Sequence, residues 1–91
     1  MRYEHKPSFF KSIKRMDHVR KEKIRHAVRV LVNSFESQQK PHGIGLKHLH
    51  KNYWEIRANI KDRILFRWAG DLVEFIIAGD HDDLSNYLKN I

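Results

Sequence analysis

Four charged side chains between Tyr53 and Asp83 have a spacing that places them together on one face of a β-sheet. Side chains alternate between the two faces of a strand, so alternate positions of neighbouring strands share a face. That face receives Glu55, Arg57, Arg63 and Arg67. A guanidinium group is planar and binds phosphate or carboxylate through two parallel hydrogen bonds. The pattern therefore predicts a polyanion site, and the stretch ends in a polar segment that contains a histidine, His81.

The strands that would position these residues are three short runs rich in Val, Ile, Phe, Tyr and Trp. The turn-forming pairs Lys61-Asp62 and Gly70-Asp71 separate them. Connections this short can only reverse the chain, so we expect a three-strand antiparallel meander. The side chains at the alternate positions, which face away from the arginines, are apolar: Trp54, Ile56, Ala58 and Ile60 in the first run, and Ile64, Phe66 and Trp68 in the second. The third run, 72–78, is almost continuously apolar, which is typical of a central strand.

The N-terminal half supplies the elements that would cover the apolar face. Residues 2–6 are expected to form a short strand ended by Pro7, and a short helix follows with Phe9, Ile13 and Met16 on one side. Asp17 is a candidate N-cap for a longer helix. Its apolar stripe has helical spacing and consists of Ile24, Ala27, Val28, Leu31 and Phe35. Its polar side has five cations, Arg20, Lys21, Lys23, Arg25 and Arg29, which either face solvent or contact RNA or an acidic partner.

Residues 37–45 are predicted to be a loop, and Asp82 or Asp83 is expected to cap a short final helix with Leu84, Tyr87 and Leu88 on its apolar side. The order is strand, two helices, three strands and a helix. This order predicts an α+β domain, residues 1–91, with the two N-terminal helices packed on one face of a small antiparallel sheet. Ile77, with Val73 and Phe75, is expected to belong to the core beneath those helices.

Composition narrows the class of partner. The net charge is +7, and residues 1–52 hold thirteen Lys or Arg against four Asp or Glu. This basic half predicts a nucleic acid, an acidic protein or an anionic surface as partner. No run is long and apolar enough to predict a membrane span or a signal peptide. The chain has no cysteine, so neither disulfides nor thiolate chemistry are expected and a reducing cytoplasm is the default location.

The element order, with the segments GLKHLHKNYWEIR and AGDHDDL, resembles the RelE/ParE superfamily of type II toxin–antitoxin toxins over essentially the whole chain. Three features are similar to the YoeB branch: the pair Lys47-His48, the pair Tyr53-Trp54, and Arg63 at the start of the next strand. The ending Gly-x-His-x-Asp-Leu is similar to the YafQ branch and places a catalytic histidine at His81. The resemblance implies a toxin that cleaves mRNA on the ribosome without a metal or other cofactor.

In such cleavage the RNA 2′-hydroxyl attacks the adjacent phosphate, so a base, an acid and cations are required. The resemblance assigns His81 as general acid, because a histidine titrates near neutral pH, with Arg57 and Arg63 holding the phosphate. Further RNA contacts are expected from basic residues around the site: Lys47, His50, Lys51, Lys61 and Arg67. An acidic antitoxin is the expected protein partner, either wrapping the helices or adding to a sheet edge.

The general base is the point at which the sequence departs from both branches. The YoeB branch has a glutamate where this chain has Ile44, and the YafQ branch has an aspartate where Lys61 aligns. Glu55 is our candidate base and His50 the second. Other interpretations stay open: a structural charge cluster around Glu55, a turn role for His81, and metal binding by His48 and His50. At the level of function, the alternative is a non-enzymatic toxin of the same fold that acts on DNA gyrase, or an inactive relic.

Overall fold

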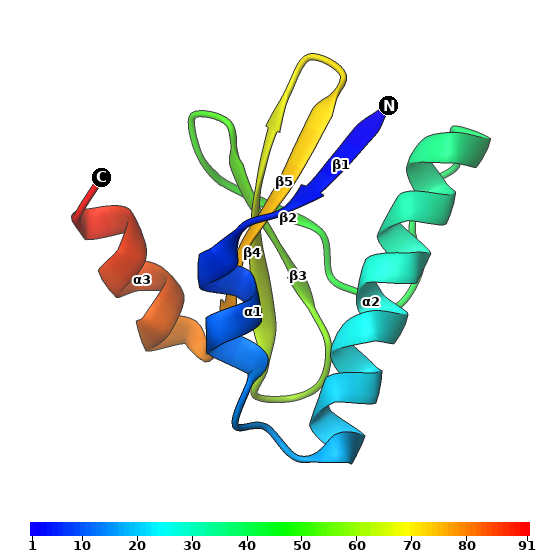
Figure 1. Ribbon diagram of the computed structural model, residues 1–91. Helices are drawn as coiled ribbons and strands as arrows, with labels where there is room; N and C mark the ends of the chain where they lie inside the picture. The colour runs from blue at the N-terminus through cyan, green and yellow to red at the C-terminus, as the bar shows by residue number, and fades with distance from the viewer.

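The computed structural model describes the whole chain, residues 1–91, as three helices and a five-stranded sheet (Figure 1). The elements are β1 Arg2–His5, α1 Pro7–Ile13, α2 His18–Ser37, β2 Lys47–His50, β3 Tyr53–Arg57, β4 Arg63–Ala69, β5 Leu72–Gly79 and α3 His81–Lys89. The predicted α+β class is confirmed. Strand β2 is an addition, since the sequence analysis assigned no strand between the loop and the meander. None of the helices has the length and apolar content needed to cross a bilayer.

The sheet is mixed, with strand order β1-β5-β4-β3-β2. Strands β3, β4 and β5 form the predicted antiparallel meander, and β2 adds to it antiparallel to β3. Strand β1, however, runs parallel to β5, from Arg2 opposite Leu72 to His5 opposite Phe75. The prediction of a purely antiparallel sheet is therefore wrong. Turn chemistry reveals how strands adjacent in sequence pair, whereas β1 and β5 are joined by a long crossover that leaves no local signal.

Helix α1 continues along the edge of β5 where β1 ends. The Ser8 hydroxyl donates to the Ile76 carbonyl oxygen at 2.6 Å, and the Ala78 N–H donates to the Ser12 hydroxyl oxygen at 2.9 Å. Two side chains one helical turn apart thus satisfy backbone groups that β1 leaves open. Phe9, on the same helix, is buried in the main core.

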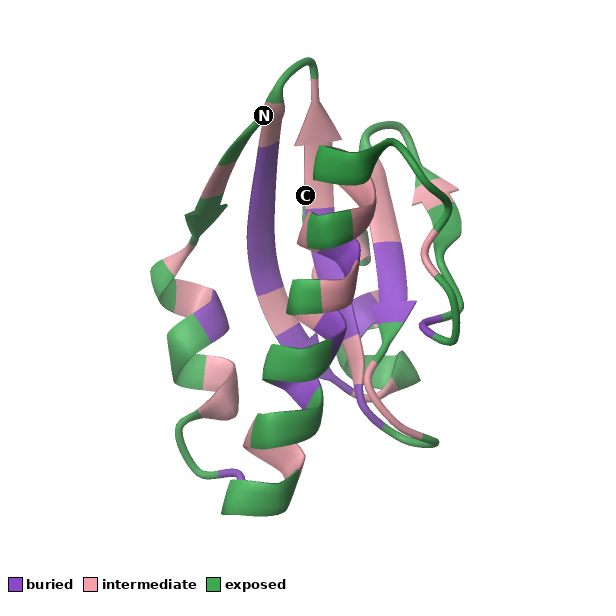
Figure 2. Ribbon diagram, turned by 90° about the vertical axis from the view of Figure 1, so that its right-hand side faces the viewer, coloured by how far each residue is buried: buried purple, intermediate pink, exposed green.

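Helix α2 begins as predicted, because the Asp17 carboxylate accepts a hydrogen bond from the Arg20 backbone N–H at 2.8 Å. Its buried residues are Ile24, Ala27 and Leu31, at the predicted helical spacing. They share a core with residues of β3, β4 and β5: Ile56, Ile64, Phe66, Val73 and Phe75. Figure 2 shows the outer side of α2 exposed and its sheet-facing side buried. Lys23, Arg25 and Arg29 therefore lie on a solvent-facing surface, whereas Arg20 and Lys21 are partly buried.

A bulge in β5 sends part of its apolar sequence to the opposite face of the sheet. Leu65 pairs with Ile77 but the next residue, Phe66, pairs with Phe75, so Ile76 is the extra residue. Ile76 and Ile77 consequently pack with Leu65 beneath Leu84 of α3. The prediction that Ile77 belongs to the core under α2 is wrong for this reason, because a bulge shifts the parity on which that prediction depended.

The packing of α3 leaves less of the predicted arginine-rich face open to solvent than the sequence suggested. Helices α2 and α3 lie on opposite sides of the sheet (Figure 1), and α3 covers the middle of the face that carries the arginines. Only the ends of that face remain open. Ile60 is a second correction: it is fully exposed rather than on the apolar face, because β3 ends at Arg57 and Ile60 lies in the following turn.

Candidate active site

Two arginines lie opposite each other at the end of the meander nearest the β3–β4 turn. Arg57 of β3 pairs in register with Arg63 of β4, and Arg63 pairs with Gly79 of β5. Like charges directly opposite on neighbouring strands are destabilising. The structure offsets this for Arg63 with a carboxylate partner, whereas Arg57 is exposed and has no ion-pair partner. The pair of guanidinium groups is therefore suited to an anion supplied from outside the chain.

Glu55 is the carboxylate partner of Arg63. Its Oε2 accepts a hydrogen bond from Arg63 Nη1 at 2.7 Å, and the two side chains are 4% and 19% exposed. The contact is diagonal, since Glu55 stands opposite Leu65 in the register. Because both side chains are largely shielded from solvent, this charged hydrogen bond restricts the Arg63 side chain to one orientation. The carboxylate that the sequence suggested as general base thus holds an arginine in the fold.

The loop before β2 supports Arg57 from the other side. The Arg57 N–H donates to the Ile44 carbonyl oxygen at 2.5 Å, and Ile44 is itself buried in the main core. Gly45 has a φ of +55°, and a Cβ at this position would be 3.4 Å from Arg57 Cδ. The arginine stem therefore lies along a backbone that favours glycine. Ile44, which the sequence resemblance aligned with a glutamate of the YoeB branch, is therefore an apolar anchor of this loop.

Helix α3 begins two residues after Gly79, at the end of the same cross-strand row. Asp80 is its N-cap: its carboxylate accepts from the Asp83 N–H, and the Asp83 carboxylate accepts from the Asp80 N–H, each at 2.9 Å. The cap is therefore Asp80, not the predicted Asp82 or Asp83. His81 is the first residue of the helix, and its side chain is exposed. The backbone thus brings the N-terminus of α3, with His81, to the end of the row that contains both arginines.

Two further features concern this helix start. A Cβ at Gly79 would overlap the Asp83 carboxylate, so this position favours glycine while the cap is in place. The hydrogen bond from the Asp83 backbone lowers the pKa of Asp80, and the nearby Lys61 ammonium lowers that pKa further. Lys61 in the β3–β4 turn is therefore close enough to the start of α3 to act on its charge. Lys61 lies in the turn between Arg57 and Arg63, so it adds a positive charge at the same end of the sheet.

The other predicted RNA contacts divide between the two ends of the sheet. Lys47 is exposed on β2 and pairs in register with Glu55, near the arginine pair. Arg67 is four residues from Arg63, or about 13 Å along the strand, and stands opposite Tyr53. His50 also pairs with Tyr53, and Lys51 follows it in the β2–β3 turn. His50, Lys51 and Arg67 thus lie at the far end.

Arg67 has protein partners at that far end. The Glu74 carboxylate accepts from Arg67 Nη1 at 3.0 Å and from Lys6 Nζ at 2.7 Å. The Lys6 hydrogen bond is the main cause of a lowered pKa of Glu74, and the bond from Arg67 adds to it. The three side chains tie β4 and β5 to the start of α1. His48 is likewise engaged, with Nε2 2.6 Å from the Lys51 carbonyl oxygen and its ring against Trp54.

The sequence analysis missed the group that holds the β3–β4 turn. Arg20 donates from Nε and Nη2 to the two carboxylate oxygens of Asp62, at 3.0 and 2.8 Å, and Asn59 donates to the same carboxylate at 2.9 Å. Asp62 is buried, and the Arg20 hydrogen bonds are the main reason that its pKa is lowered. The spacing of Asn59 and Asp62 indicates a turn, but no signal in the sequence connects that turn to Arg20.

Comparisons with known proteins identify this architecture at the level of the fold. No protein-family model and no curated protein matches the chain. A chain of the RelB-RelE antitoxin–toxin complex from Methanococcus jannaschii has a TM-score of 0.69 at 17% identity, covering 92% of this chain and 96% of that one. The DinJ-YafQ complex of E. coli gives 0.72 at 20% identity, covering 92% and 98%. A YoeB/ParE toxin from Agrobacterium tumefaciens gives 0.64 at 23% identity, covering 89% and 99%.

The chain has a RelE-like fold. The predicted resemblance to RelE, YafQ and YoeB is confirmed in this structural sense. The residues predicted for catalysis sit within that fold at one end of the meander: Arg57 and Arg63 on neighbouring strands, Glu55 beneath them, and His81 on the adjoining helix start.

Proposed function

We propose that this RelE-like chain is the toxin of a type II toxin–antitoxin system, and that it cleaves mRNA on the ribosome without a metal. The observation that carries the proposal is the opposed pair Arg57–Arg63 at the end of the row that leads into α3. The Glu55 carboxylate pairs with the guanidinium group of Arg63, and the guanidinium group of Arg57 has no ion-pair partner. A phosphodiester in this region would supply the missing negative charge.

The chemistry proposed is an internal transfer within the RNA. The 2′-hydroxyl gives its proton to solvent water and its oxygen bonds to the adjacent phosphorus. The bond from phosphorus to the 5′-oxygen breaks, and that oxygen takes a proton from His81. The products are a 2′,3′-cyclic phosphate and a free 5′-hydroxyl. Arg57 and Arg63 stabilise the charge on the phosphate oxygens, where one donor contributes about 3–4 kcal/mol to the transition state. His81 donates the proton to the leaving oxygen, and Lys47 and Lys61 add positive charge.

For Glu55 the buried ion pair supports a positioning role, in which the carboxylate holds Arg63 in the orientation that meets the phosphate. A base would need a carboxylate free to accept the 2′-hydroxyl proton. The variant Glu55→Gln separates the two roles. A positioning residue gives a rate loss of similar size at every pH, whereas loss of a base also removes the acidic limb of the pH–rate profile.

The partner proposed is an acidic antitoxin. The net charge of +7 favours an acidic partner, and two of the structures with the same fold are antitoxin complexes, RelB-RelE and DinJ-YafQ. Ribosomes as the target would place the active toxin in the cytoplasm.

The direct test is primer-extension mapping of mRNA in cells that express the chain. Codon-phased cleavage is expected, with loss on His81→Ala and on Arg63→Ala. Arg2→Ala is the matched control, because Arg2 is also an arginine of the sheet but lies exposed on β1, paired with Asp71. Cleavage that survives both site variants would refute the assigned residues.

A second candidate is favoured by one observation, the burial of Glu55 in its ion pair. A candidate base that is already engaged in an ion pair is compatible with a non-enzymatic toxin of this fold that inhibits DNA gyrase, or with an inactive relic that only binds an antitoxin. Growth arrest with intact mRNA and a DNA-damage response identifies the gyrase inhibitor. No growth effect, together with a stable antitoxin complex, identifies the relic.

A further inference from the structure

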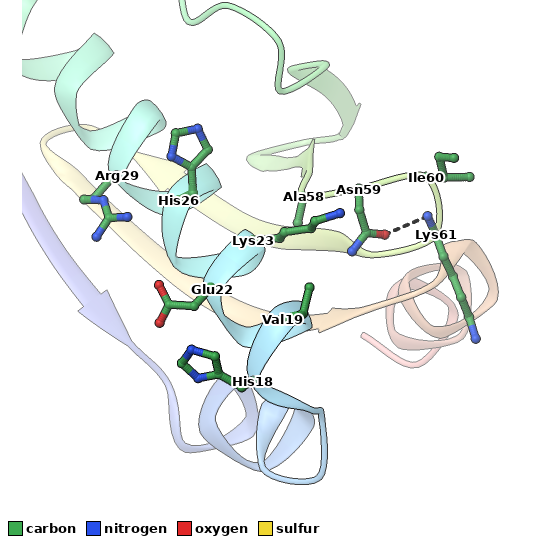
Figure 3. A pocket seen from close by; sticks show the side chains of 10 residues that line it. All are labelled: His18, Val19, Glu22, Lys23, His26, Arg29, Ala58, Asn59, Ile60 and Lys61. Atoms are coloured by element: carbon green, nitrogen blue, oxygen red, sulfur yellow. Dashed lines mark hydrogen bonds between the residues drawn. The ribbon is translucent and has the colours of Figure 1, made fainter.

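A broad, open hollow lies between the outer side of α2 and the β3–β4 turn, and the proposed chemistry uses only Lys61 at its margin. Six of its lining residues come from α2, from His18 to Arg29, and four come from the turn, Ala58 to Lys61 (Figure 3). We call it the α2–turn hollow. Lys23 extends from the helix toward the turn, and Ile60 stands at the tip of that turn (Figure 3).

Two exposed aliphatic residues mark the hollow. Val19 is 63% exposed and Ile60 is fully exposed. The turn that carries Ile60 is held rigidly, because Asn59 Oδ1 accepts from the backbone N–H groups of Lys61 and Asp62 at 2.8 and 2.7 Å. The ion pair of Asp62 with Arg20 then ties this turn to α2. The fold therefore holds the apolar Ile60 side chain in water at a fixed position.

The surroundings of these two residues are positively charged. Lys23, Arg29 and Lys61 line the hollow, and its only carboxylate, that of Glu22, is paired with Arg25. The N-cap carboxylate of α2, that of Asp17, is already engaged by the Arg20 N–H. The unpaired charge of the hollow is therefore positive, which suits an anionic ligand.

The same lining separates an acidic protein from RNA as that ligand. Bases of single-stranded RNA stack best on large aromatic rings; the hollow contains no Phe, Tyr or Trp, and its stacking groups are limited to His18, His26 and Arg29. A phosphate backbone would also leave Ile60 and Val19 uncovered. A peptide with carboxylates on either side of a leucine-like side chain matches both features.

We propose that the α2–turn hollow docks an acidic segment of a partner protein, with an aliphatic side chain of that segment on Ile60 and Val19 and its carboxylates on Lys23 and Arg29. The inference rests on the proposed acidic partner and gives that partner a surface. The surface is separate from the arginine pair, Glu55 and His81, none of which lines the hollow, and it shares only Lys61 with the proposed cleavage site.

The test is an NMR titration of the ¹⁵N-labelled full chain with a synthetic glutamate-rich helical peptide that has leucines at i and i+4. Saturable shifts are expected at Val19, Lys23 and Ile60. Ile60→Ser should raise the Kd about tenfold or more, since burying an aliphatic side chain contributes at least that much. Ile91→Ser is the matched control, the same change at another exposed isoleucine, 59% exposed at the C-terminus, and should change the Kd less than about twofold.

Three results would overturn the proposal: no saturable binding, shifts confined to other surfaces, or equal Kd values for the wild type and Ile60→Ser. A single-stranded RNA oligonucleotide that binds the same residues more tightly than the peptide, with no dependence on Ile60, would also overturn it and would assign the hollow to RNA. Measuring mRNA cleavage by Ile60→Ser keeps the two proposals separate. Cleavage is expected to persist in this variant whether or not peptide binding is lost.

Discussion

Replacing Asp62 by alanine is expected to destabilise the fold by about 2–3 kcal/mol. Removing one partner of a buried ion pair costs about 3–5 kcal/mol. Here Asp62 is buried, but the Arg20 side chain is 39% exposed and water can hydrate it once the carboxylate is gone. The expected loss is therefore reduced. At roughly 4–8 °C per kcal/mol for a domain of this size, the melting temperature should fall by about 10–20 °C.

The effect should depend on pH in one direction. Arg20 lowers the pKa of Asp62 from its usual value of 3.8, so the folded state binds the proton less readily than the unfolded state does. The stabilisation is therefore complete above about pH 4–5 and is lost as the pH falls through the folded-state pKa. Urea unfolding of the wild type and of Asp62→Ala should give a large difference at pH 7 and a smaller one near pH 2–3.

The control is Asp71→Ala, which makes the same change in the β4–β5 hairpin turn. Asp71 is 70% exposed and pairs with Arg2 at 3.6 Å, so this variant should lose less than about 1 kcal/mol. A double-mutant cycle of Arg20→Ala with Asp62→Ala should show a coupling of about 1–2 kcal/mol. Equal losses for the two aspartates, or no coupling, would contradict the role given to this ion pair.

Three smaller effects are expected elsewhere. Gly79→Ala should lower the free energy of unfolding, measured in urea, by about 1–3 kcal/mol because its Cβ would overlap the Asp83 carboxylate. Adding Asp83→Ala to the same chain should recover part of that loss. An unchanged stability of Gly79→Ala would rule out the capping geometry. Burial, with the hydrogen bond to Glu36, raises the pKa of Tyr3 to about 12, so ultraviolet titration should show one late tyrosine that moves toward 10 in Glu36→Gln, and an unchanged curve would disprove the contact. Ser12→Ala should cost about 1–2 kcal/mol by leaving a β5 backbone N–H without its partner, and a loss near zero would mean that water replaces the hydroxyl.

The parts of the fold that the sequence predicts are those set by neighbours in the chain. The meander follows from two turn pairs, and the start of α2 follows from one capping side chain, Asp17. The cross-strand pairing of Arg57 with Arg63 was predictable in the same way, since the alternation of side chains and a short turn bring both to one face. These features need no knowledge of what covers the sheet.

The features that were missed depend on contacts between distant segments. The parallel pairing of β1 with β5 and the ion pair of Arg20 with Asp62 each join residues more than forty positions apart. The bulge adds one residue, Ile76, to β5, and this moves the Ile77 side chain to the opposite face of the sheet. A prediction from strict alternation of side chains cannot foresee such an added residue. Burial of Glu55 has the same origin, because it depends on the edge strand β2 pairing with β3 and on the ion pair with Arg63 of β4.

The central claim is that the arginine pair and His81 cleave RNA, and the chemistry of the new RNA ends tests it most directly. Purified protein is incubated with programmed ribosomes, and the mRNA fragments are analysed for their termini. The proposed mechanism predicts fragments that end in a 2′,3′-cyclic phosphate and begin with a 5′-hydroxyl, formed by the wild type and not by His81→Ala. Intact mRNA, or fragments that begin with a 5′-phosphate, would contradict it.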